Sequence, residues 1–257
     1  MEIIIISIAA FLTSVLTFFS GFGLGTILAP VFALFFPIDV AIALTGVVHF
    51  TNNIFKIGLV GKNADKSMLF KFGIPAILAS FVGAWVLMQI SDMGPLFSYQ
   101  ILDGHFDVTT VKLVISVLLI LFSILEISPR LKEIHFGKDK LIFGGILSGF
   151  FGGLAGIQGA FRSAFLIKAG LSKEAYIATG VIIACMVDFT RLSVYASRFD
   201  TANLNDNIPL LVSATLSAII GAVLGKKLLK KITLRSMQLV VAIMLMLISV
   251  ALGFGFI

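Results

Sequence analysis

Two glycine-rich stretches, FFSGFGLG at Phe18–Gly25 and FFGGLAG at Phe150–Gly156, decide how this chain is interpreted. Each precedes a short apolar stretch and then a longer apolar segment that contains Thr-Gly-Val, at Thr45–Val47 and again at Thr179–Val181. Paired glycine-interrupted segments at matching places in two halves are typical of the binding site of a membrane carrier. We therefore interpret the chain as two copies of one interrupted membrane unit.

The composition assigns the chain to the membrane proteins. Of its 257 residues 59% are hydrophobic and 12% are charged, and the mean hydropathy is +1.11. Soluble domains carry roughly 25% charged residues, and apolar runs that could cross a hydrocarbon core of about 30 Å recur along the sequence. We expect an all-α polytopic membrane protein with one transmembrane domain over residues 1–257.

Several other classes are disfavoured. The net charge of +6 comes from short basic loops between apolar runs, which is typical of membrane topology rather than of nucleic-acid binding. The sequence lacks the metalloprotease and nucleophile-elbow motifs and any acidic cluster suited to a metal, so we predict neither an enzyme nor a cofactor. Cys185, the single cysteine, lies in an apolar segment and is expected to be a small core residue.

Ten apolar segments divide the chain. Two of them are too short for an ordinary span of about 20 residues, and each follows a glycine-rich stretch, so we expect half-helices or re-entrant arms there. The other eight are predicted to be full spans. The segments are 3–21, 25–36, 38–60, 67–90, 110–127, 140–156, 158–169, 172–197, 207–229 and 235–256, of which 25–36 and 158–169 are the short ones.

Lysine and arginine in the loops predict the orientation. The loop near 61–71, the linker 128–139 and the loop near 226–235 are basic and are expected on the cytoplasmic side. The loop 91–109 is acidic and is expected outside, with both chain termini. Counting crossings then makes the two halves inverted repeats, about 3–127 and 140–257, which could expose one central site to either side in turn.

Charged groups within spans cost about 2.5–3.5 kcal/mol each and therefore mark candidate sites. Arg162 follows Gly156 and Gln158 in the second short arm, where a helix N-terminus would add backbone donors for an anion. Gly23 and Gly25 occupy the corresponding place in the first half. An arginine that reaches the interface or pairs with a carboxylate is the alternative for Arg162, and close helix packing is the alternative for the glycines.

Asp188 and Arg191 lie three residues apart on one helical face. The two are predicted to form a neutralising pair. Alternatively, Asp188 holds Arg191 or Arg162 in position or carries a coupling proton. Arg191 could instead lie near the outer interface.

Three polar residues and a lysine interrupt the corresponding segment of the first half. His49 and Asn53 share one face, and Asn52 and Lys56 share the neighbouring one. His49 is expected either to contact substrate or protons or simply to hydrogen-bond a neighbouring helix. Asn52 and Asn53 are candidates for substrate contact, and Lys56 is expected to reach towards the cytoplasmic interface.

The duplicated glycine-rich openings, the two Thr-Gly-Val segments, the Asn52-Asn53-x-x-Lys56 element and the count of spans resemble the TauE/SafE sulfite exporter family over about residues 3–257. The second half departs from the first, because Met186, Val187 and Asp188 stand near where Asn52 and Asn53 would fall. That difference disfavours a symmetric two-sided site. The resemblance does not assign the residues that coordinate the anion.

The resemblance implies transport of sulfite, sulfonates or related sulfur-containing anions across the plasma membrane of a bacterium or archaeon, with export as the expected direction. The expected partners are the anion and the lipid bilayer, and a homodimer is left open. A channel of the same architecture and, more remotely, an intramembrane enzyme that uses His49 or Asp188 are the alternatives. Exact substrate and coupling ion are not determined by the sequence.

Overall fold

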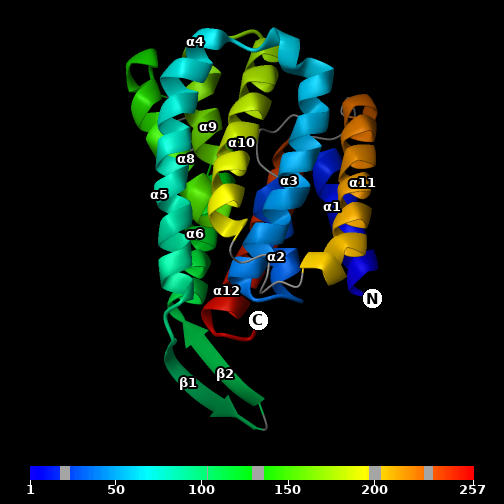
Figure 1. Ribbon diagram of the computed structural model, residues 1–257, viewed down its shortest axis with the longest axis vertical. Helices are drawn as coiled ribbons and strands as arrows, with labels where there is room; N and C mark the ends of the chain where they lie inside the picture. The colour runs from blue at the N-terminus through cyan, green and yellow to red at the C-terminus, as the bar shows by residue number, and fades with distance from the viewer. Residues whose placement is uncertain (18–23, 103, 129–135, 197–203, 229–233) are drawn as a thin grey trace.

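The structure is a computed structural model that describes residues 1–17, 24–102, 104–128, 136–196, 204–228 and 234–257, and these residues are mostly helical (Figure 1). The first half holds α1 (Glu2–Thr17), α2 (Leu24–Ala33), α3 (Ile38–Val60), η1 (Gly61–Asn63), α4 (Lys66–Met68), η2 (Leu69–Gly73), α5 (Ile74–Ser91) and α6 (Thr110–Ile127). The second half holds η3 (Lys138–Lys140), α8 (Leu141–Ala155), α9 (Gly159–Leu166), η4 (Ile167–Ala169), α10 (Lys173–Tyr195), α11 (Leu204–Leu228) and α12 (Leu234–Gly253). Each predicted apolar segment contains a helix whose ends lie within a few residues of the expected ones.

Local sequence explains where several helices begin and end. The side chains of Asp65, Thr109 and Ser172 each accept a backbone N–H from the first turn of the helix that follows, at 2.9, 3.3 and 3.2 Å. Gly156 and Gly170 follow α8 and η4 in the left-handed backbone region, with φ of 74° and 76°. Glycine adopts that conformation without the strain that a Cβ would add, and so it ends both helices.

Four helical stretches among the described residues are long and apolar enough to cross a membrane, namely Ile38–Asn63, Lys66–Ser91, Lys173–Tyr195 and Asn207–Gly225. Shorter apolar helices accompany them at Glu2–Val15, Leu24–Ala33, Thr110–Leu125, Leu141–Ala155 and Ala242–Gly253. The outward faces of the helices carry large exposed apolar side chains, such as Leu78, Phe81 and Trp85 on α5 and Leu216 and Ile220 on α11. Such an apolar exterior is what lipid requires of a spanning bundle.

Helices of one half of the chain pack against helices of the other half. The first helix of one half packs along the fourth of the other, in α1 with α11 and again in α5 with α8. Within each of these pairs the helices run in the same direction, since Ser7 meets Ser213 and Phe11 meets Gly221 in one pair. The third helices pair with each other (α3 with α10), as do the last (α6 with α12).

Glycines allow α8 to approach α5 closely. The positions Gly145, Gly149 and Gly153 recur every four residues and face the backbone carbonyls of Phe72, Ala76 and Ser80. A Cβ at any of the three would overlap those oxygens. Small residues at helix interfaces commonly produce such contacts in membranes, where dispersion between close backbones replaces the hydrophobic effect.

The two short helices lie where the sequence predicts them. All ten residues of α2 are buried, so this helix lies inside the bundle and contacts no lipid along its length. α9 is eight residues long and follows α8 after a reversal at Gly156–Gln158. The glycine-rich stretch that precedes α2, Gly23 included, falls outside the described residues, as do most of the linker 128–139 and the loop near 198–206.

The all-helical prediction is wrong for the acidic loop. Residues Pro95–Ile101 and Gly104–Thr109 form an antiparallel hairpin of strands β1 and β2 that projects from the end of the bundle (Figure 1). The aromatic and β-branched residues of both strands favour extended backbone. The Tyr99 hydroxyl donates to the Phe254 carbonyl and Phe106 stacks on Tyr99, which attaches the hairpin to the C-terminal helix end. Both chain termini lie at this same end, and α4 lies at the opposite one (Figure 1).

Candidate functional site

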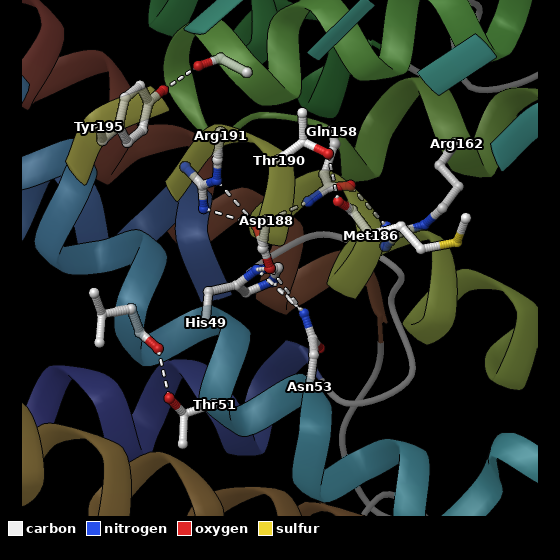
Figure 2. A network of polar contacts seen from close by, with 12 residues as sticks. His49, Thr51, Asn53, Gln158, Arg162, Met186, Asp188, Thr190, Arg191 and Tyr195 are labelled. Carbon is white, nitrogen blue, oxygen red and sulfur yellow. Dashed lines mark hydrogen bonds and ion pairs between the residues drawn. The ribbon is translucent and has the colours of Figure 1, made fainter. Parts of the chain in front are cut away.

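The Asp188 carboxylate of α10 is the centre of a buried polar network between the two halves (Figure 2). It is fully buried, and each of its oxygens has two partner side chains. His49 Nδ1 lies 2.5 Å from Oδ2 and Asn53 Nδ2 donates to the same oxygen at 3.2 Å. Gln158 Nε2 and Arg191 Nε donate to Oδ1 at 3.3 and 3.0 Å. The carboxylate is therefore compensated in the way a buried charge requires.

Arg191 is enclosed on all sides and has 0% exposure. Its Nη2 lies 2.9 Å from Asp188 Oδ1, so the two side chains form a buried ion pair and Arg191 does not lie at the outer interface. A Cβ at Gly156 would come within 2.8 Å of Nη1, and one at Gly46 would lie 3.4 Å from Cζ. These two glycines make room for the guanidinium between α3, α8 and α10.

Arg162 of α9 connects to the same network through Gln158. Its Nη1 donates to Gln158 Oε1 at 3.4 Å, and Gln158 Nε2 in turn donates to Asp188 Oδ1 (Figure 2). The residue is 8% exposed, so it does not reach an aqueous interface along the protein surface. A Cβ at Gly180 would lie 3.4 Å from Nε, which places the guanidinium against the α10 backbone.

The glycine of the duplicated Thr-Gly pair thus lies against an arginine side chain in both halves. Gly46 of α3 lies against the Arg191 guanidinium, and Gly180 of α10 lies against that of Arg162. A Cβ at either glycine would lie in van der Waals contact with the guanidinium. The repeated motif therefore corresponds to two arginine positions, one beside each third helix.

Lys56 differs from its sequence prediction. It is expected to extend to the cytoplasmic interface, yet it is only 7% exposed and therefore lies inside the bundle. α3 packs against α2, α10 and α11 within the bundle. Its neighbour one turn earlier, Asn52, is fully buried, and neither of its amide atoms has a protein hydrogen-bond partner.

The sequence-predicted residues largely come together. His49, Asn53, Gln158, Asp188 and Arg191 share one network, with Arg162 attached through Gln158. Gly25 lies beside them, since a Cβ there would be 3.2 Å from the Gly156 carbonyl oxygen and 4.0 Å from the His49 ring. Asn52 lies on the neighbouring face with Lys56.

Sequence reasoning did not assign the buried Lys56 to the site. The signal was its i, i+4 spacing from Asn52 on a polar face of an otherwise apolar helix. Among the residues that the structure describes, no group of three or more histidine, cysteine or acidic side chains could hold a metal ion.

The fold and this network describe a polytopic helical protein with several cations buried at the contact between two halves. The chain belongs to the sulfite exporter TauE/SafE family, whose model matches residues 6–252. The family is one of membrane transporters for sulfite and related sulfur anions, and this chain is a multi-pass membrane protein of that family. No curated protein and no solved structure gives a match to the chain.

Proposed function

We propose that this protein is an alternating-access carrier that exports small sulfur-containing anions, such as sulfite or a sulfonate, across the plasma membrane. The observation that carries the proposal is the set of buried cations on α3, α9 and α10: Lys56, Arg162 and Arg191. Buried charges in a membrane bundle are costly and mark the path of a charged substrate. Cations in that place are suited to an anion.

Within the network, we assign the direct substrate contacts to Arg162 and Asn52. Arg162 offers a fork of N–H donors suited to oxyanions, and the Asn52 amide is buried without a protein partner. His49, Asn53 and Gln158 all contact the Asp188 carboxylate, which is itself an internal oxyanion. Their role is to hold that carboxylate while Arg191 is neutralised, and to bind substrate when the network opens. Gly25 and Gly156 provide the close backbone approach in this proposal, and Gly23 stays a substrate contact predicted from the sequence alone.

The proposed mechanism needs two inverted repeats within one domain of residues 1–257, at about 3–127 and 140–257, with eight spans, the linker 128–139 inside and both termini outside. The reciprocal pairing of α1 with α11 and of α5 with α8 supports this arrangement. So does the position of both termini beside the hairpin of the acidic loop (Figure 1). Rocking of one half against the other would open the Asp188 network to each side in turn.

The membrane potential supplies a driving force in the export direction. An inside-negative potential favours outward movement of an anion by about 2.3 kcal/mol per charge per 100 mV. No coupling ion is needed for export on this account, because the potential acts on the substrate itself.

Counterflow in proteoliposomes tests the carrier. Vesicles loaded with unlabelled sulfite and diluted into a trace of radiolabelled sulfite should transiently accumulate label, because a carrier exchanges substrate across its two open states. A channel would let the label equilibrate without the overshoot. Empty vesicles and vesicles that contain Arg162→Gln protein, which should show no overshoot, are the controls. Equilibration without overshoot in wild-type vesicles would contradict alternating access.

A further inference from the structure

Two buried polar side chains of α3 have no hydrogen-bond partner in the part of the chain that the structure describes. Thr45 is 1% exposed and its hydroxyl is unpaired, and Asn52 is 0% exposed with both amide atoms unpaired. The large majority of buried polar side-chain atoms in proteins are paired, because a buried group without a partner carries its full desolvation cost. Two such groups on one helix indicate a partner that is not part of the protein.

Thr45 and Asn52 lie on the same side of α3. They are seven residues apart, which is almost two full turns, so their side chains point in nearly the same direction about 10 Å apart along the axis. His49 lies between them on this buried face and against the Asp188 carboxylate (Figure 2). A Cβ at Gly25 would lie 4.0 Å from the His49 ring, so the first turn of α2 covers the middle of the face. Thr45, His49 and Asn52 thus form a polar row inside the bundle, the α3 row.

The corresponding threonine of the second half is paired. Thr179 stands where Thr45 does in the duplicated Thr-Gly-Val motif, and it is as deeply buried, with 0% exposure. Its hydroxyl accepts the Asp65 backbone N–H at 2.9 Å, which holds the segment after η1 against α10. The same residue type at corresponding places therefore has a structural partner in one half and none in the other.

The rest of the corresponding face of α10 is apolar. Four and seven residues after its threonine stand Ile183 and Met186, in the places of His49 and Asn52. A Cβ at Gly73 would lie 3.6 Å from the Ile183 side chain and 3.7 Å from that of Met186, so both pack on the end of η2. The third helix of the second half therefore presents a dry packing face where α3 presents the polar row.

We propose that Thr45 is a substrate contact in addition to Asn52, and that the transported oxyanion moves along the α3 row rather than between matching faces of α3 and α10. This assignment rests on the proposed transport function. The row is enclosed in the present structure, and in an open conformation the hydroxyl and the amide donate hydrogen bonds to the oxyanion. Neutral donors at successive places bind an anion weakly enough to release it, as passage across a membrane requires.

Sulfite counterflow and thermal unfolding of Thr45→Val and Thr179→Val proteins test the row. Each change replaces a buried hydroxyl by a methyl group of similar shape. Thr45→Val should raise the KM for sulfite by about tenfold or more, since a hydrogen bond to a charged group is worth that factor. Its melting temperature should stay the same or rise, because no protein hydrogen bond is lost. Thr179→Val should keep the wild-type KM and melt about 2–4 °C lower, because the Asp65 N–H loses its acceptor.

Thr45→Ser keeps the hydroxyl and should stay within about threefold of the wild-type KM, which separates hydrogen bonding from packing. A melting temperature of Thr45→Val as low as that of Thr179→Val would show that the Thr45 hydroxyl has a protein partner. A wild-type KM in Thr45→Val, or equal rises in KM for Thr45→Val and Thr45→Ser, would show that the hydroxyl does not meet the substrate. Any of these three results overturns the assignment while the carrier stands. Wild-type vesicles without counterflow contradict the proposed function and the assignment together.

Discussion

The His49 imidazole and the Asp188 carboxylate lie 139 residues apart in the chain, and their Nδ1 and Oδ2 atoms meet at 2.5 Å in the buried interior. His49 belongs to the third helix of the first half and Asp188 to the third helix of the second. The contact therefore joins the two halves at the place where the buried cations gather.

Asp188→Asn should destabilise the protein by about 3–5 kcal/mol, because removal of one partner leaves the Arg191 guanidinium buried without its counter-charge. Thermal unfolding in detergent measures the loss. Asp139→Asn, at an exposed carboxylate of η3, is the control and should unfold like the wild type. The double variant Asp188→Asn with Arg191→Gln should recover part of the loss, since both charges are gone. Strictly additive losses in the double variant would contradict the ion pair.

Gly149→Ala should weaken the packing of α8 on α5 by about 1–3 kcal/mol, because the new methyl group would overlap the Ala76 carbonyl oxygen. Gly58→Ala is the matched control. A Cβ at Gly58 meets nothing within 4 Å on the exposed face of α3, so this change should be neutral or stabilise by about 0.5–1 kcal/mol. Melting temperatures that rank the two variants in the opposite order would show that the helices do not approach as closely as described.

Gly156→Ala should reduce sulfite flux by more than its backbone strain alone would explain. Its φ of 74° strains any other residue, and its Cβ would lie 2.8 Å from Arg191 Nη1 and displace that side chain from Asp188. Gly170→Ala carries the same backbone strain at an exposed position and isolates that contribution. We expect Gly156→Ala to melt at a lower temperature than Gly170→Ala, because the Arg191–Asp188 pair is disturbed as well, and we expect a clear loss of flux in Gly156→Ala alone. Equal flux in both would remove Gly156 from the site.

Reporter fusions test the proposed orientation. A reporter enzyme that is active only outside the cytoplasm should be active when it is fused after Ile257 and inactive when it is inserted beside Lys62. The basic loops predict this result, and the C-terminus and η1 belong to opposite ends of the bundle (Figure 1). The reverse pattern would invert the orientation and with it the direction of each proposed opening.

Most of the helical architecture was accessible from the sequence because hydropathy and glycine placement report directly on spans and interruptions. The short helices at 24–33 and 159–166 follow from glycine-rich stretches before short apolar runs. The β-hairpin was missed because the acidic residues of 91–109 were interpreted only as topology signals. The alternating aromatic residues Phe97, Tyr99 and Phe106 were the signal that could have predicted it.

The residues of the site were also accessible, but not their partners. Periodicity places His49 with Asn53 on one face of α3 and Asp188 with Arg191 on one face of α10. It cannot predict that all four meet, since that depends on how α3 and α10 pack. The burial of Lys56 depends on the same packing. The sequence alone places this lysine near the end of a span and predicts that it reaches the interface, whereas the structure places it inside the bundle.

The most direct test of the central claim is sulfite efflux from proteoliposomes under an imposed membrane potential, with wild-type, Arg162→Gln and Lys62→Gln proteins compared. The account predicts that wild-type and Lys62→Gln proteins release sulfite faster when the compartment that holds it is negative. Arg162→Gln protein should be inserted in equal amount and show flux no greater than that of empty vesicles. Wild-type flux from Arg162→Gln would contradict the assignment of the buried cations as the anion site.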